Sequence, residues 1–323
     1  MTKKPISIEI LRILEYSDYL SSQELFSYLK NKNIATDEKK IRYTLNELHK
    51  EKKVKKVNSK WRITEKGIES LNRAITFERA FETHQILEYN LLHSTFDLYN
   101  LEGTVPTIFT TVDKDKVDLA LELIYEVFRS GLSVSNRVCL FDEEIEIGGV
   151  RVPEGLMGIG VVSSLVHDVI MLNIGLPLNP EYAGLIEYKN SSPSRVVELI
   201  NYKGTTINPG TLLLRGGYTS VNKICEKGEG NAVIGIRTFS RYGIFEAEKE
   251  AQVAKSRGIC SILAISHPGS DTYGFINYNR GLMILSAGIN QFAPMWEMGF
   301  DLDLKLKRIL IDFKLFKKID SLI

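Results

Sequence analysis

Apolar residues recur at helical spacing in the first fifty residues of the chain. Ile8, Leu11 and Leu14 lie three residues apart and predict a helix over residues 6–16. Further on, Ser21 and Glu24 have the spacing of a capping box, which predicts the start of a second helix. A third helix is expected from a cap at Thr36 or Asp37 to His49, with three inward-facing residues: Ile41, Leu45 and Leu48.

A β-hairpin is expected after the third helix, with strands at residues 54–57 and 61–64 around a turn at Asn58 and Ser59. Three short helices followed by a hairpin predict a winged helix-turn-helix domain over residues 1–75. This segment holds 17 Lys and Arg against 10 Asp and Glu, whereas the rest of the chain is net acidic. A basic domain on a mildly acidic protein favours binding of a nucleic acid.

The positive residues concentrate on the third helix and the hairpin. Long side chains with hydrogen-bond donors on the helix after the turn can reach base edges in the major groove of DNA. Clustered lysines can neutralise the phosphates of the backbone. A winged helix can also bind RNA or another protein, and this alternative stays open. The candidate DNA-binding residues are Lys39, Lys40, Arg42, Tyr43 and Asn46 on the helix and Lys55, Lys56, Lys60 and Arg62 in the hairpin.

Residues 64–89 contain no Pro and no Gly after Gly67, which predicts a continuous helix. Residues 76–92 are expected to form a connector helix between the winged helix and the rest of the chain. Ile68, Leu71 and Ile75 form an apolar stripe. This stripe either packs on the following domain or forms a dimer contact.

Residues 93–323 carry two similar halves. A strand at 107–111, a helix at 114–128 and a strand near Val138 are matched by a strand at 232–237, a helix at 245–255 and a strand near Ile262. Gly-Leu-Met runs beginning at Gly155 and Gly281 follow at a nearly equal interval. The pattern predicts an internally duplicated α+β domain.

The apolar residues 155–178 are interrupted by Asp168, so a buried strand and a core helix are expected there rather than a membrane span. Residues 211–215 suggest a strand. The Gly216-Gly217 turn leads into a helix that Thr219 would cap, which is the geometry of an anion site. It matches neither a Walker A loop nor a dinucleotide fingerprint.

Catalytic and metal-binding patterns are absent from the sequence, so we expect neither an enzyme nor a metal or cofactor. The three cysteines lie far apart without a CxxC pair, and the N-terminus has no apolar signal segment. A reduced, cytoplasmic protein without a membrane segment is the natural interpretation.

Several runs from residue 93 to 304 resemble the regulatory domain of the NrpR family, nitrogen-regulation repressors of methanogenic archaea. They include residues 94–98, 152–155, 175–178, 202–209 and 217–221. The winged helix lies where that family places it. The resemblance implies a homodimeric repressor of nitrogen-assimilation genes that binds palindromic operators in double-stranded DNA and is released by 2-oxoglutarate.

The resemblance also places Arg237 at a matching position, at the end of an expected central strand. The chain differs from the family pattern at residues 163–164, 166–169, 238–240 and 287–291, so the effector is expected to be 2-oxoglutarate or a similar small acid. A buried ion pair is the alternative role for Arg237. The candidate effector-binding residues are Arg237, Thr219, Ser220, Ser163, Ser164 and Asn290.

Overall fold

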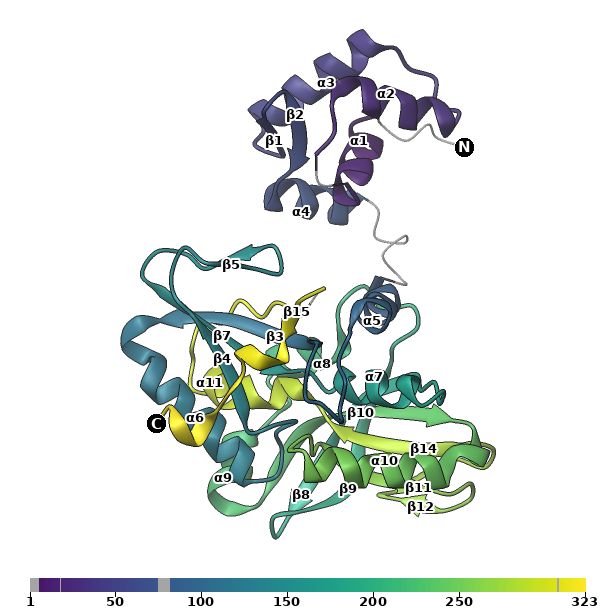
Figure 1. Ribbon diagram of the computed structural model, residues 1–323, viewed down its shortest axis with the longest axis vertical. Coiled ribbons are helices and arrows are strands. Elements are labelled where there is room, and N and C mark those ends of the chain that lie inside the picture. Colours follow the sequence, from purple (N-terminus) through teal and green to yellow (C-terminus); the bar gives the residue numbers. More distant parts are fainter. Residues whose placement is uncertain (1–5, 18, 75–81, 307) are drawn as a thin grey trace. The chain divides into compact units, whose positions relative to one another are not determined.

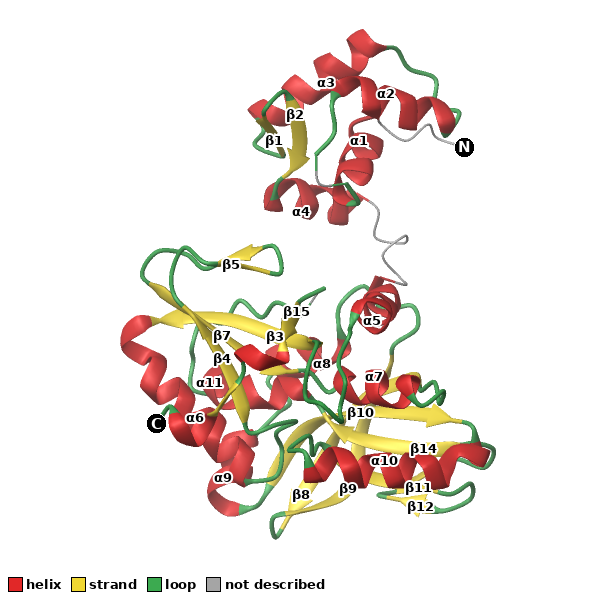
Figure 2. Cartoon of the chain, viewed as in Figure 1, coloured by secondary structure: helices red, strands yellow, loops and turns green. Residues whose placement is uncertain are grey.

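The computed structural model describes the chain except for residues 1–5, 18, 75–81 and 307. Internal contacts divide the chain into residues 1–80 and residues 81–323, called here the winged-helix domain and the C-terminal unit. Both combine helices and strands, which confirms the predicted α+β class (Figure 2). No helix among the described residues is long and apolar enough to cross a membrane.

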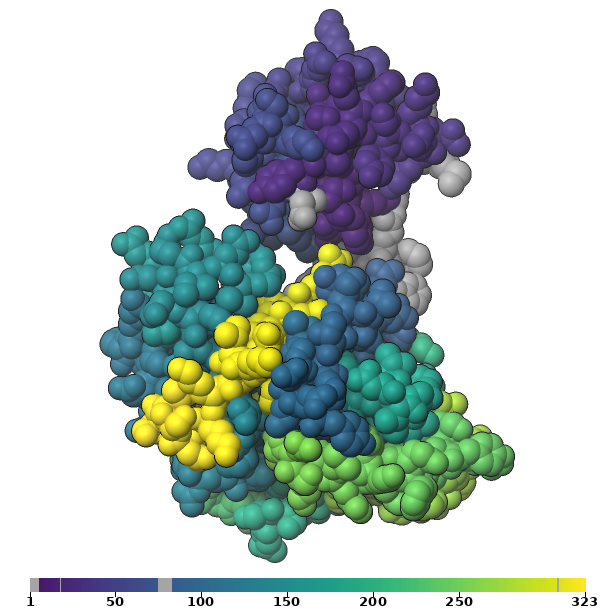
Figure 3. Space-filling view, in the orientation of Figure 1, coloured from purple at the N-terminus to yellow at the C-terminus, as the bar shows by residue number. Residues whose placement is uncertain are grey.

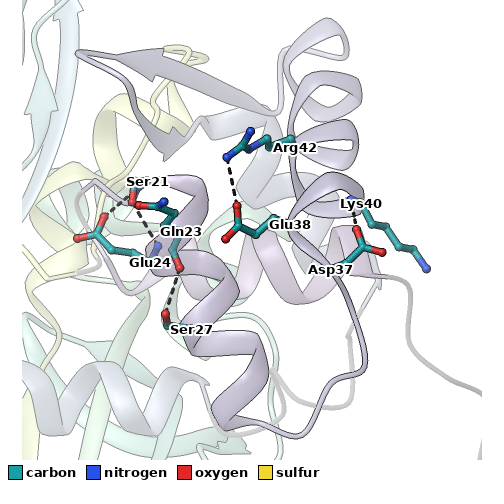
Figure 4. Close-up of polar contacts among 8 residues, drawn as sticks. All are labelled: Ser21, Gln23, Glu24, Ser27, Asp37, Glu38, Lys40 and Arg42. Atoms are coloured by element: carbon teal, nitrogen blue, oxygen red, sulfur yellow. Dashed lines mark hydrogen bonds and ion pairs between the residues drawn. The ribbon is translucent and has the colours of Figure 1, made fainter.

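The winged-helix domain has the predicted order of three helices and a hairpin. The capping box is present: the amide of Glu24 donates to the Ser21 hydroxyl, and the amide of Ser21 donates to the Glu24 carboxylate (Figure 4). Asp37 caps the third helix by accepting from the amide of Lys40 at 2.7 Å. The elements are α1 (Ile6–Glu15), α2 (Ser22–Asn31), α3 (Glu38–Lys50), β1 (Val54–Val57), β2 (Lys60–Ile63) and α4 (Glu65–Ala74).

The predicted helix over residues 64–89 lies partly outside the described residues. Within it, α4 covers Glu65–Ala74, and α5 (Glu82–His93) belongs to the C-terminal unit, while residues 75–81 are not described. Leu71 is buried in the core of the winged-helix domain, and Ile68 packs against it. The stripe is therefore covered within this domain, while Ile75 lies outside the described residues.

The C-terminal unit contains the predicted duplication. Each half runs strand, 3₁₀ turn, helix, strand, small hairpin, strand and helix. The first half has β3 (Thr104–Asp113), η2 (Lys114–Lys116), α6 (Val117–Arg129), β4 (Arg137–Phe141), β5 (Glu146–Ile147), β6 (Val150–Arg151), β7 (Leu156–Val162) and α7 (Leu165–Asn173). The second half has β10 (Gly230–Phe239), η3 (Arg241–Gly243), α10 (Ile244–Ser256), β11 (Ile262–Ser266), β12 (Asp271–Thr272), β13 (Phe275–Ile276), β14 (Gly281–Ser286), η4 (Gly288–Phe292) and α11 (Ala293–Glu297).

The two halves exchange strands. The sheet of the first half has the order β15-β3-β7-β4-β16, and the sheet of the second has the order β11-β14-β10-β8-β9. Strand β8 follows the first half along the chain but pairs with β10, whereas β15 follows the second half but pairs with β3. The added strands are β8 (Asn179–Lys189), β9 (Ser192–Asn201), β15 (Leu310–Asp312) and β16 (Lys317–Lys318).

Helix packing also crosses between the halves. The largest core contains residues of β3, β7 and α6 together with residues of β8, β10 and α11. In a second, smaller core, α10 lies along β11 and β14 and packs with α7 of the first half (Figure 1). The C-terminal segment, yellow in Figure 3, runs over the surface of this unit. The amide of Phe313 in this segment donates to the carbonyl of Gly103. Neither half thus completes its core alone.

One local prediction is wrong. Residues 211–215 belong to helix α8 (Pro209–Arg215), because the Asn208 side chain caps the amide of Thr211 and Pro209 suits the first helical turn. The Gly-Leu-Met runs each lie at the start of a strand, as predicted: Gly281 is the first residue of β14, and Gly155 directly precedes β7.

Candidate functional site

One face of α3 presents polar side chains away from the core of the winged-helix domain. Lys39, Arg42, Tyr43 and Asn46 have the spacing i, i+3, i+4 and i+7, so they share this face, and all four are exposed. The buried residues Ile41, Leu45 and Leu48 lie opposite. Lys40 is exposed beside the row. The helix thus offers a row of donors and one aromatic ring of the kind that contacts base edges.

The hairpin adds positive charge. Lys55, Lys56 and Lys60 are exposed, whereas Arg62 is half-buried. The Nη1 of Arg62 donates to the Tyr19 hydroxyl at 3.4 Å, and its guanidinium lies over the Tyr19 ring. Arg62 is therefore partly engaged in packing, whereas the ammonium groups of the exposed lysines reach the surface, where phosphates could contact them.

Carboxylates contact two of the predicted DNA-binding residues. Arg42 Nη2 lies 3.2 Å from Glu38 Oε2, one turn away on α3 (Figure 4). Lys60 Nζ lies 3.8 Å from Glu24, whose pKa is lowered by the hydrogen bonds from Ser21. Within the described part of the chain, four of the predicted lysines form no ion pair: Lys39, Lys40, Lys55 and Lys56, the last of which lies over the Trp61 ring.

Arg237 lies on β10, the central strand of its sheet, and its side chain is 2% exposed. Its Nε donates to Asp168 Oδ1 at 2.8 Å, and its guanidinium lies 5.5 Å from the centre of the Tyr202 ring. The buried ion pair considered as the alternative role for Arg237 is therefore present. Burial raises the pKa of Asp168, against the opposing effect of Arg237.

The start of α7 lies close to this ion pair. Ser164 is the N-cap of α7, and its side chain makes no capping hydrogen bond. It stands one turn before Asp168, about 6 Å along the helix and on the same face. The buried Ser163 precedes it, and its amide donates to the carbonyl of Pro106. Ser164 thus lies one turn from Asp168, the partner of Arg237, on the same helix.

Asn290 is fully engaged inside the protein. Its Oδ1 accepts from the amide of Val233 at 2.9 Å, and its Nδ2 donates to the Val233 carbonyl and to Ser286 Oγ. Val233 lies four residues from Arg237 along β10, a distance of about 13 Å. Asn290 therefore anchors the middle of β10 and lies apart from the ion pair.

Thr219 and Ser220 lie at the other end of β10 from Arg237. The N-cap of helix α9 (Val221–Lys227) is Ser220, not Thr219 as predicted, because the Ser220 hydroxyl accepts from the amide of Asn231 and fixes this residue before the helix. Ser220 also lines a surface pocket of about 390 Å³ beside Lys223 and Glu229. Asn231 is six residues from Arg237, about 20 Å along an extended strand.

A carboxylate of the protein itself occupies the anion-binding geometry predicted there. The amides of Val221 and Asn222 donate to Oε1 and Oε2 of Glu297 at 2.8 and 2.9 Å. Glu297 ends α11, so this contact joins α11 to the start of α9. The first free amides of α9 are thus already used.

Sequence reasoning missed three partners: Asp168, Glu38 and Glu297. Asp168 interrupts the apolar residues 155–178 in the sequence, and the adjacent His167 is a second polar residue there; in the structure the two side chains have different partners. His167 Nε2 lies 2.9 Å from Ser261 Oγ, while Asp168 contacts Arg237. Polar residues in an otherwise apolar helix therefore indicated that this helix has polar contacts with the other half of the C-terminal unit.

The fold and these two sites define a winged-helix protein with a duplicated α+β regulatory unit. The chain belongs to the NrpR family: the family model described as NrpR regulatory domains NRD1 and 2 matches residues 81–318. A second model, the ribonuclease R winged-helix domain, matches residues 8–71.

Similar proteins agree with this assignment. A protein of Methanosarcina mazei named global nitrogen regulator NrpRI is 26% identical over 97% of each chain. The global nitrogen regulator NrpR of Methanocaldococcus jannaschii is 29% identical over 91% of this chain but only 51% of its own length. The crystal structure of a nitrogen repressor-like protein from Methanococcus jannaschii superposes with a TM-score of 0.61 at 21% identity, covering 75% of this chain and 98% of that one. This last likeness shows the fold.

Proposed function

We propose that the protein is a transcription regulator of nitrogen metabolism that binds double-stranded DNA through α3 and the β1–β2 hairpin. The observation that carries the proposal is the exposed row of Lys39, Arg42, Tyr43 and Asn46 on the helix that follows the turn. The names of the relatives, global nitrogen regulators, support the biological role.

In this proposal, α3 enters the major groove and the hairpin lysines contact phosphates. Two copies on a palindromic operator would repress the neighbouring genes, which requires a homodimer. Light scattering of the full chain tests the assembly: a dimer at micromolar concentration is expected, and a monomer bound singly to DNA contradicts it.

The effector in this proposal is 2-oxoglutarate or a similar small acid, bound at Arg237 and the start of α7. A guanidinium and a helix N-terminus both favour a carboxylate. Because Arg237 is 2% exposed and paired with Asp168, the acid has to replace the Asp168 carboxylate. Since Asp168 and Arg237 belong to different halves, this replacement would change how the halves pack.

Two titrations test these points. Anisotropy of a labelled duplex library should rise with protein, and 2-oxoglutarate should lower the affinity. Absence of binding to any duplex contradicts the DNA-binding proposal. Binding that no acid in a panel of dicarboxylates changes contradicts the effector proposal alone.

RNA binding is the second candidate function, and the match to the ribonuclease R winged-helix model favours it. The same basic surface would contact the sugar-phosphate backbone of either DNA or RNA, because phosphate contacts carry no sequence information. Competition separates the two: if unlabelled RNA displaces the duplex more effectively than unlabelled DNA, RNA is the preferred ligand.

A further inference from the structure

We propose that Glu38 is a specificity-determining residue of α3: it orients Arg42 toward a guanine and makes α3 reject other bases at that position. The inference rests on the proposed DNA binding. It starts from the contact between Glu38 Oε2 and Arg42 Nη2, 3.2 Å apart on the polar face of the helix (Figure 4).

Glu38 lies where α3 would meet the DNA. It is the first residue of α3, directly after the cap Asp37, and the N-terminal part of a recognition helix is the part that contacts base edges. The side chains of Glu38 and Arg42 are 44% and 61% exposed. Lys39 and Tyr43 lie next to them in sequence on the same stretch of exposed surface.

A carboxylate on a DNA-facing surface opposes binding, because phosphates repel it. Its presence there therefore needs a compensating role. An arginine has five donors in a planar fork, so one edge can bind Glu38 while another binds the O6 and N7 acceptors of guanine. The Glu38 carboxylate holds the Arg42 guanidinium in place before DNA binds. Arg42 therefore loses less side-chain conformational entropy when it contacts the base.

The same carboxylate discriminates against wrong bases. It can accept only, so it is compatible with the N4 amino group of cytosine and unfavourable beside the acceptors of thymine or guanine. Glu38 and Arg42 together thus fit a G·C pair or two adjacent G·C pairs. Rejection by a misplaced charge is a common source of specificity.

The alternative role of Glu38 is structural, since an acid in the first turn stabilises a helix. Glu47 on the same helix offers a matched control: it forms an ion pair with Lys50 at 2.9 Å, one turn from the C-terminal end. Glu38→Gln and Glu47→Gln remove the same charge from the same helix at opposite ends.

The test is selection of bound sequences from a randomised duplex library by the full-length wild type, Glu38→Gln, Glu47→Gln and Arg42→Ala, with the affinity for random duplex measured beside it. We expect wild type to enrich a G·C pair in each half-site and Glu47→Gln to keep it. Arg42→Ala and Glu38→Gln should lose it at the same position, by roughly 5-fold or more, the lower bound for a bidentate base contact. Glu38→Gln should nevertheless bind random duplex more tightly than wild type.

Three results with the variants would overturn the inference: an unchanged G·C preference in Glu38→Gln, a preference lost at a position different from that of Arg42→Ala, or an equal loss in Glu47→Gln. A wild type that binds duplex without enriching any sequence also overturns it. A wild type that binds no duplex contradicts the proposed function itself. Helical content and melting temperature of the variants verify that each domain remains folded.

Discussion

Asp168 on α7 and Arg237 on β10 form an ion pair between the two halves of the C-terminal unit, with 2.8 Å between Oδ1 and Nε. Both side chains are at most 2% exposed. Within the described residues, Asp168 Oδ2 has no hydrogen-bond partner, so the carboxylate is held by one side only. The pair is thus a buried charged contact between the two halves.

Removing either partner should destabilise the C-terminal unit. We expect Arg237→Ala and Asp168→Ala to lower its free energy of unfolding by about 3–5 kcal/mol, because each leaves the other charge buried and unpaired. The double variant Asp168→Leu with Arg237→Met should recover most of that loss. Urea denaturation of the full chain, followed by circular dichroism, measures the difference; single variants that unfold like wild type would contradict the role given to the pair.

Protonation of His167 should destabilise the protein in acid. His167 is fully buried, and burial, reinforced by the charge of Arg237, lowers its pKa to about 3 from the usual 6.5. The unfolded chain therefore binds this proton first, and the contribution of His167 is complete above about pH 6.5 and is lost as the pH falls toward 3. The slope should reach about 1.4 kcal/mol per pH unit.

Comparison of variants separates the pH dependence of stability due to His167 from that due to Asp168. The raised pKa of Asp168 makes stability increase, not decrease, as the pH falls. His167→Gln should flatten the dependence between pH 6.5 and 4, whereas His267→Gln, at an exposed position, should leave it unchanged. Equal slopes in wild type and His167→Gln would show that His167 is not held neutral by its surroundings.

Glu297 should stabilise the contact between α11 and α9. Its two oxygens accept from the amides of Val221 and Asn222. Glu297→Ala leaves both amides without that partner and should cost about 1–3 kcal/mol. Glu226→Ala, on the exposed side of α9, is the control and should change the melting temperature little. Similar melting temperatures for both variants would argue against the cap.

The sequence pattern predicted the winged-helix domain well, because its helices depend on local signals such as the Ser21–Glu24 capping box and the spacing of Ile41, Leu45 and Leu48. The duplication could be predicted for the same reason, since each half repeats the same local patterns. The exchange of β8 and β15 could not be predicted, because local sequence patterns do not specify which distant strands pair. Helix α8 was mistaken for a strand because the Asn208 cap was read only as a turn.

The candidate sites also differ in how far local sequence patterns predict them. Exposure of Lys39, Arg42, Tyr43 and Asn46 follows from helical periodicity, so it could be predicted. The partners of Arg237 and of the α9 amides come from segments about 70 residues away in the chain, Asp168 and Glu297, and only the folded structure brings them together. Predictions from periodicity therefore reached the surface of α3 but not the interior of the C-terminal unit.

The two surfaces proposed to contact DNA should respond differently to mutation. Arg42→Ala should weaken binding to preferred duplexes by about 1–3 kcal/mol and binding to random duplexes much less, because it would remove the proposed base contact. Lys55→Ala with Lys56→Ala should weaken both alike and reduce the salt slope, because these residues would contact phosphates. Anisotropy titrations against a selected and a scrambled duplex compare them; equal losses on both duplexes for Arg42→Ala would remove it from base recognition.

The salt dependence of duplex binding by the full-length protein tests the central claim, that this is a DNA-binding regulator, most directly. With about six phosphates contacted by a dimer, the logarithm of the association constant should fall against the logarithm of salt concentration with a slope near −5. Addition of 2-oxoglutarate or a related acid should weaken the binding at each salt concentration. Binding that does not depend on salt, or no binding to any duplex, would contradict the account.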